Sequence, residues 1–184
     1  MDATAIAAAI GEALPGVPVE VAPSIDLHST IYVTPENLID VLRTLRDRPD
    51  LRFALLSEMT AADFWPSDPR FEVIYILVSI EHRLRVRLKV RVAGEDPHLP
   101  TATVVWPAAN WLEREVWDMF GILIDGHNDL RRLLMPEDWE GHPARKDYPV
   151  QIRKAAQTYE PLEVSEEEFR ANMERDRVKR RATN

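Results

Sequence analysis

The sequence predicts an α+β domain, a small mixed sheet with packing helices, followed by an extended C-terminal arm. In segment 83–92, leucine and valine alternate with arginine and lysine, as in a strand with one apolar and one charged face. Segment 71–79 is almost continuously apolar, which is typical of a central strand covered on both faces. Residues 38–45 carry apolar side chains at helical spacing. Strands and helices are therefore expected in one domain.

The N-terminal elements are expected to be a helix, two strands and a second helix. Residues 3–14 are rich in alanine and stop at a Pro-Gly pair, so they predict a short helix. Segments 17–21 and 29–33 are candidate strands. The tripeptide Thr-Pro-Glu at 34–36 supplies a cap, a proline at the first helical position and an early acid. The helix that begins there should end before Pro49.

The middle of the chain is expected to form the rest of the sheet. Residues 51–57 predict a short apolar strand, and residues 61–69, with two aromatic residues and two prolines, predict an irregular aromatic loop. The short spacing between 71–79 and 83–92 predicts a hairpin. The charged face of 83–92 has two interpretations, either a solvated face that protects the sheet or a docking face for an acidic partner.

Three segments follow from these patterns. Residues 1–98 form the α+β domain. Residues 99–150 are rich in prolines, tryptophans and charges, show no strand pattern, and are expected to form a helix and interface loops. Residues 151–184 form a tail with a terminal helix at 165–181, which begins with a capping-box pattern and ends in basic residues. Because its apolar side is thin, this helix should need a partner surface.

Composition excludes several classes of function. The 184 residues include no cysteine, which excludes disulfides, thiolate ligation of iron–sulfur clusters and cysteine zinc sites. The net charge of -8 argues against general nucleic-acid binding. No stretch approaches the roughly 18 consecutive apolar residues of a membrane span, and the N-terminus lacks the basic region of a signal peptide. The chain is therefore expected to be cytoplasmic, with membrane contact only through partners.

Residues 111–120 predict a helix with Asn110 as its N-cap and Gly121 just past its end. A projection at about 100° per residue divides its side chains into an apolar and a charged arc. The core face is expected to contain Leu112, Val116, Met119 and Phe120. On the other side, Arg114 and Asp118 are four residues apart and are expected to pair.

Two side chains do not fit this division. Glu115 projects at the edge of the apolar arc, where a carboxylate needs a cationic partner such as Arg131, Arg132 or Arg145. The alternative is a general acid or base with a raised pKa. Trp117 projects into the charged arc, which predicts burial either against another chain or under the chain's own tail.

The loops beyond this helix contain His127 and His142 beside glycines. Neither shows a ligand spacing such as H-x3-H, so we expect hydrogen-bonded loop histidines and no metal. There is no phosphate-binding loop and no nucleophile elbow. Segment 136–143 is stiffened by prolines and offers Trp139 as a large anchor, which favours an ordered interface loop.

The same region resembles a known family. Residues 111–122 read WLEREVWDMFGI and residues 126–149 read GHNDLRRLLMPEDWEGHPARKDYP, and together they are similar to the signature of the C subunit, the 30 kDa subunit, of NADH-quinone oxidoreductase (respiratory complex I). Two positions depart from that signature. Trp117 replaces an expected tyrosine, and Asn128 replaces a proline.

The resemblance implies a structural and docking subunit in the peripheral arm of a proton-translocating enzyme, at the cytoplasmic side of the inner membrane. It implies packing against the D subunit, which helps to form the quinone site, and a place near the B subunit. The complex is implied to use FMN, iron–sulfur clusters, NADH and quinone, but this chain is implied to hold no catalytic, cofactor or metal residue. The signature residues are implied to be structural and interfacial: Glu113, Arg114, Glu115, Trp117, Asp118, His127, Arg131, Trp139, His142, Arg145, Lys146 and Asp147.

Three alternatives stay open. The first is the same role in a related membrane-bound hydrogenase or a ferredoxin- or deazaflavin-linked complex. The second is a stand-alone carboxylate enzyme that uses Glu113, Glu115, Asp118 and His127. The third is a nucleic-acid adaptor that binds through the basic strand, with salt-sensitive affinity.

Overall fold

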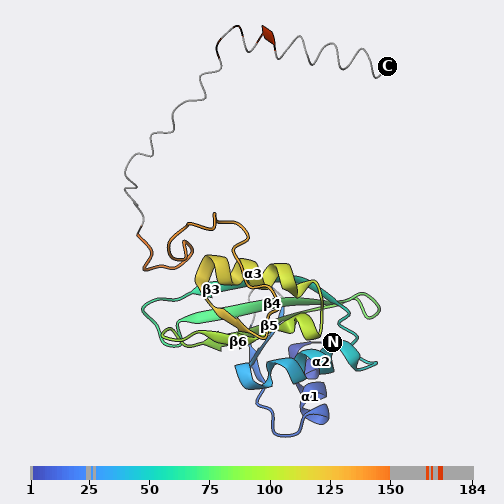
Figure 1. Ribbon diagram of the computed structural model, residues 1–184. Helices are drawn as coiled ribbons and strands as arrows, with labels where there is room; N and C mark the ends of the chain where they lie inside the picture. Colours follow the sequence, from blue (N-terminus) through green and yellow to red (C-terminus); the bar gives the residue numbers. More distant parts are fainter. Residues whose placement is uncertain are drawn as a thin grey trace, which may run out of the picture. The chain divides into compact units, whose positions relative to one another are not determined.

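The computed structural model describes residues 2–23, 26, 28–149, 165, 167 and 170–171. The chain divides into two compact units, 1–148 and 149–184, and nearly all described residues belong to the first. This unit combines a five-stranded sheet, a two-stranded sheet and three α-helices, which confirms the α+β prediction (Figure 1). The expected helix 165–181 lies almost entirely outside the described residues. Within the described part of the chain, no helix is both long enough and apolar enough to cross a membrane.

The main sheet has the strand order β1-β2-β5-β4-β3. Its strands are β1 (Glu20–Ala22), β2 (Ser29–Val33), β3 (Leu55–Asp63), β4 (Phe71–Ser79) and β5 (Leu84–Val92). Strands β2 and β5 are parallel and the other pairs are antiparallel, so the sheet is mixed as expected. The hairpin between β4 and β5 is also confirmed.

The hydrophobic core lies on one face of this sheet. Helix α1 (Ala3–Ala13), helix α2 (Leu38–Asp47) and helix α3 (Ala109–Phe120) contribute their buried apolar residues to the same cluster as β2, β3, β4 and β5. Helix α3 packs against β3, whereas α1 packs against β1 and β2 (Figure 1). Along β4, buried residues alternate with half-buried ones. Residues 71–79 were expected to be covered on both faces, but within the described part of the chain one face of β4 is only half-buried.

The opposite face carries the cations of β5. Arg87, Lys89 and Arg91 form ion pairs with Asp26, Glu72 and Glu20, at 2.6, 2.8 and 2.9 Å. Burial alone would lower the pKa of Lys89, but its bond to Glu72 raises it. Because three of the four cations of β5 are matched within the chain and only the exposed Arg85 has no ion pair among the described residues, the basic stripe fits a solvated face better than a docking face.

Strand β3 differs from the prediction. It begins at Leu55 and ends at Asp63, whereas residues 51–57 were expected to be the strand and 61–69 a loop. Leu51 and Phe53 are fully buried in the turn after α2, where the amide of Phe53 donates to the carbonyl of Leu45 at 2.9 Å. These apolar residues therefore fill the core under α2 and do not begin a strand.

The region after residue 98 contains regular structure that the sequence did not reveal. Strands β6 (His98–Pro100) and β7 (Leu123–Asp125) form a parallel pair, although no strand was expected there. A three-residue strand is too short to show a periodic pattern. A 3-10 helix, Ala102–Val104, precedes α3, as another, Pro35–Asn37, precedes α2 earlier in the chain. Asn110 lies inside α3 and is not its N-cap, whereas Gly121 ends the helix in the left-handed conformation as predicted.

Candidate interaction site

Asp118 joins α3 to the segment that follows it. Its carboxylate is fully buried and accepts hydrogen bonds from the amides of Leu133, Leu134 and Met135, at 3.0, 2.8 and 2.9 Å. Arg132 Nη1 donates a further bond of 2.7 Å. Burial alone would raise the pKa of Asp118, but these donors outweigh it and hold the pKa below its usual range. One carboxylate therefore fixes the start of residues 130–148, which are called the arm from here on.

Arg132 links Asp118 to a later part of the arm. Its Nη2 donates to the carbonyls of Trp139 and Gly141, at 2.6 and 3.1 Å, and its guanidinium lies 5.7 Å from the Trp117 ring centroid. Trp117 also makes an edge-to-face contact with the ring of His142, with centroids 6.1 Å apart. Trp117 is thus half-buried against residues 132 and 142 of its own chain, whereas the tail 151–184 lies almost entirely outside the described residues, so both interpretations of Trp117 stay predictions.

Arg114 does not pair with Asp118, contrary to the sequence prediction. It donates to the carbonyls of Arg131 and Arg132, at 3.1 and 2.9 Å. Its guanidinium also lies 4.9 Å from the ring centroid of Trp111, a side chain that is 60% exposed. Four-residue spacing predicted the pair, but Asp118 is occupied by Arg132 and by the three amides.

Glu113 is the most unexpected side chain of α3. The helical projection places it on the charged arc, but it is fully buried and accepts bonds from the hydroxyl of Thr101 and the amide of Ala102. Burial raises the pKa of Glu113, although these two donors oppose the shift. On the predicted core face Val116 is buried, but Leu112, Met119 and Phe120 are only half-buried. Because α3 packs against β3 and also binds residues 131–132, its charged arc is covered as well.

His127 packs beside this carboxylate. Its Nε2 lies 3.8 Å from the nearest oxygen of Glu113 and donates to the carbonyl of Asn110 at 3.1 Å. Its Nδ1 accepts the amide hydrogen of Asp129. The ring is therefore held on both nitrogens by the main chain, as expected for a hydrogen-bonded loop histidine.

Glu115 has no hydrogen bond or ion pair within the described residues, so the expected arginine partner is wrong. Arg131 pairs with Asp129 at 3.0 Å, Arg132 is engaged by Asp118, and Arg145 donates to a carbonyl at the end of α3. Glu115 is half-buried. Its interfacial role stays a prediction.

A second ion cluster fixes the far end of the arm to the sheet. Asp63, whose side chain is fully buried, binds Arg70 at 2.7 Å and accepts the amides of Trp65 and Lys146, at 2.9 and 2.8 Å. Arg70 also binds Asp147 at 2.7 Å. Sequence reasoning named Lys146 and Asp147 but missed Asp63 and Arg70. No local spacing links residues so far apart in the chain.

This cluster makes stability depend on pH. Burial would raise the pKa of Asp63, but Arg70 and the two amides lower it from 3.8 to about 2. A depressed pKa stabilises the fold above the pKa of the unfolded side chain, about 4, and that contribution disappears as the pH falls to about 2. We expect the Asp63→Asn variant to lack about 2 kcal/mol of this pH-dependent stability. Urea unfolding at a series of pH values between 6 and 2 checks this, with Ser67→Ala as the control. If the free energy of unfolding of the wild type and of Asp63→Asn changed in parallel with pH, the prediction would be contradicted.

Around Gly121 the chain approaches itself closely. His142 Nδ1 donates to the carbonyl of Asp118 at 3.0 Å, and Arg145 Nε donates to that of Phe120. A methyl group on Gly121 would overlap the ring of His142. Burial lowers the pKa of His142, with a smaller opposing effect from its bond to the carbonyl. The arm is therefore seated on the end of α3.

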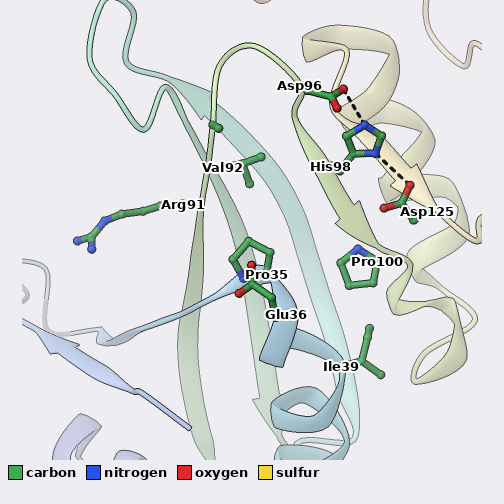
Figure 2. Close-up of a pocket in the computed structure, with 10 residues that line it drawn as sticks. Pro35, Glu36, Ile39, Arg91, Val92, Asp96, His98, Pro100 and Asp125 are labelled. Atoms are coloured by element: carbon green, nitrogen blue, oxygen red, sulfur yellow. Dashed lines mark hydrogen bonds and ion pairs between the residues drawn. The ribbon is translucent and has the colours of Figure 1, made fainter.

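None of these side chains lines a groove that the described residues form elsewhere on the molecule. That groove, of about 520 Å³, lies between the start of α2 and the strands β5, β6 and β7 (Figure 2). At its rim His98 lies between Asp125 and Asp96, at 3.1 and 2.7 Å, and these bonds raise the pKa of His98. Among the described residues, no group of three or more histidine or acidic side chains could hold a metal ion.

The arrangement of α3 and the arm holds an ordered surface in place. Asp118, Glu113 and Asp63 are fully buried and hold the main chain of the arm or of the residues before α3. At its surface Trp111 and Leu134 are each 60% exposed. Such a surface is suited to binding another macromolecule, because its backbone is already ordered.

Comparisons with known proteins agree with this description. Residues 31–154 match the model of a family described as respiratory-chain NADH dehydrogenase, 30 Kd subunit. The C subunit of NADH-quinone oxidoreductase from Roseiflexus sp. (strain RS-1) is 50% identical over 130 residues, which cover 71% of this chain and 75% of that protein.

Two solved structures are also similar. A trypsin-resistant fragment of Nqo5 has 30% identity and a TM-score of 0.50, with 69% of this chain and 97% of the fragment covered. A chain of the membrane-bound sulfane sulfur reductase, an archaeal respiratory membrane complex, has 26% identity and a TM-score of 0.67, with 80% and 85% covered.

Proposed function

The chain belongs to the 30 kDa subunit family of the respiratory-chain NADH dehydrogenase, and on that premise we propose that it is a structural docking subunit of a proton-translocating NADH:quinone oxidoreductase. Its curated relatives are subunits of this oxidoreductase complex. In the proposed role the chain sits peripherally on the cytoplasmic side of the inner membrane. It packs against the quinone-site (D) subunit, near the B subunit, while FMN and iron–sulfur clusters reside on other chains.

One observation carries this proposal, namely that charged residues of the signature and of the sheet hold the arm in place. Asp118 and Arg132 tie the arm to α3, while Asp63 and Arg70 tie it to the sheet. These four side chains therefore hold the arm, and the surface that it presents, in place. The interfacial residues proposed on that surface are Trp111, Glu115, Arg131, Leu134, Trp139 and Lys146.

The same geometry disfavours a stand-alone carboxylate enzyme. Glu113, Asp118 and the side chain of His127 are all buried, and each is hydrogen-bonded to the main chain. A general acid or base must reach a proton of its substrate. Among the four candidates, Glu115 is the one whose side chain is not fully buried.

A second candidate is a related respiratory complex with another electron donor or acceptor. It is favoured by the similarity to a chain of the archaeal membrane-bound sulfane sulfur reductase, whose TM-score exceeds that of the Nqo5 fragment. The docking role of the chain would be the same. Only the partner subunits and the reaction would differ.

The experiment is purification of the native complex through this chain. An N-terminal tag is added, membranes of the host are solubilised in mild detergent, and the eluate is tested for NADH oxidation with a quinone analogue. We expect a large complex with flavin and iron–sulfur absorbance and with that activity. The same complex with activity only towards another donor would favour the second candidate. A lone colourless chain would contradict both.

A further inference from the structure

The turn between β3 and β4, residues 64–69, presents two aromatic rings to solvent. Phe64 is 48% exposed and Trp65 is 55% exposed. Within the described residues neither ring contacts another ring or a cation, in contrast to Trp111, which lies under Arg114. Exposed aromatic side chains of this size leave apolar surface in water that a partner could bury.

The backbone of this turn is held by hydrogen bonds at three of its residues. The amide of Phe64 donates to the carbonyl of Arg70 at 2.8 Å, and the amide of Ser67 donates to the carbonyl of Phe64 at 2.9 Å. The amide of Trp65 donates to the buried carboxylate of Asp63. Because the main chain is already held by these bonds, little backbone entropy remains to be lost when the rings are buried.

The turn is also joined to the arm. Asp63 accepts the amide of Lys146, and Arg70 binds both Asp63 and Asp147. The main chain of the turn therefore lies close to that of residues 146–147, because the amides of Trp65 and Lys146 bind the same carboxylate, at the edge of the surface proposed for docking. Any subunit that covers this end of the arm would meet Phe64 and Trp65.

The charges of the turn indicate the chemistry of the partner. Residues 64–69 read FWPSDP and contain one acid, Asp68, and no cation. Asp68 is exposed and forms no hydrogen bond or ion pair within the part of the chain that the structure describes. A partner suited to this turn needs an apolar pocket for the rings and a lysine or arginine at its rim for Asp68.

We propose that Phe64 and Trp65 form a docking knob that inserts into an apolar, basic-rimmed pocket of a neighbouring subunit of the complex. This inference rests on the proposed function, because it requires that the chain be part of a complex. It adds a contact outside the signature segment, made by the turn between two strands of the main sheet.

The absence of cysteine from the sequence makes a direct test simple. The variant Ser67→Cys introduces a single thiol into the turn of the full-length chain. We expect a maleimide to label the isolated chain readily and the assembled complex hardly at all. A benzophenone maleimide attached before assembly should crosslink to another subunit, at a peptide that combines apolar residues with a lysine or arginine.

Each other result has a defined meaning. Equal labelling of the isolated chain and the complex, or crosslinks only to lipid or to a second copy of the chain, would overturn the knob while leaving the proposed function intact. Failure of the tagged chain to purify with a complex would overturn the proposed function itself. Those two failures are thus distinguishable.

A second set of variants tests the chemistry of the contact. Trp65→Ser and Asp68→Lys should each lower the fraction of chain retained in the complex during detergent washes. The control is Ile80→Ser, a side chain that is 70% exposed at the other end of β4. Equal losses from all three variants would show that the effect is not specific to the knob and would overturn it.

Discussion

Replacing Asp118 with alanine should lower the free energy of unfolding by about 3–5 kcal/mol, because a buried charge partner is removed. The variant leaves Arg132 without its carboxylate and leaves the amides of Leu133, Leu134 and Met135 without their acceptor. The effect should be measured by urea unfolding of the full chain, followed by circular dichroism.

The matched control lies on the same helix. Glu115→Ala removes a carboxylate that has no hydrogen bond or ion pair within the described residues, so we expect a change within about 0.5 kcal/mol. Equal effects of the two substitutions would contradict the assignment of Asp118 as the residue that fixes the arm.

The second large effect is expected at Gly121. Its φ of 71° is left-handed, which costs a residue with a Cβ about 1–2 kcal/mol. A Cβ would also overlap His142 Cδ2 and lie 2.9 Å from Arg145 Nη2, so the loop must move. Overpacking of this kind adds about 1–3 kcal/mol. Gly121→Ala should therefore destabilise the chain, and trypsin should cleave at Arg145 or Lys146 faster than in the wild type.

Gly11→Ala provides the opposite control. Gly11 lies inside α1, and a methyl group added to it would have no neighbour within 4 Å, so alanine should stabilise the chain by about 0.5–1 kcal/mol. A Gly121→Ala variant as stable as the Gly11→Ala variant would mean that the arm is not seated on the end of α3.

Elements with a strong local pattern were predictable from the sequence. Segments 29–33 and 71–79 coincide with β2 and β4, and β5 begins one residue later than expected. The helical spacing at 38–45 and the left-handed glycine at 121 were also confirmed. In each case the evidence lies within a few neighbouring residues. The family was recognisable for the same reason, because its signature is a continuous run.

Other features depend on contacts between distant residues. The apolar residues at 51 and 53 resemble the start of a strand, but they fill the space under α2. The four-residue spacing predicted a pair between Arg114 and Asp118, whereas residues of the arm are the actual partners of both side chains. Asp63, Arg70 and Asp147 come together only when the sheet and arm have formed. No periodicity within one element could reveal these connections.

The most direct test of a docking role separates assembly from turnover. A host that lacks its own copy of the chain is supplied with wild-type chain or with Asp118→Asn, and the NADH:quinone activity of its membranes is divided by their content of complex-bound flavin. The docking role predicts less assembled complex with the variant but unchanged activity per flavin. A normal amount of complex with strongly reduced activity per flavin would contradict it, and would place Asp118 in the reaction itself.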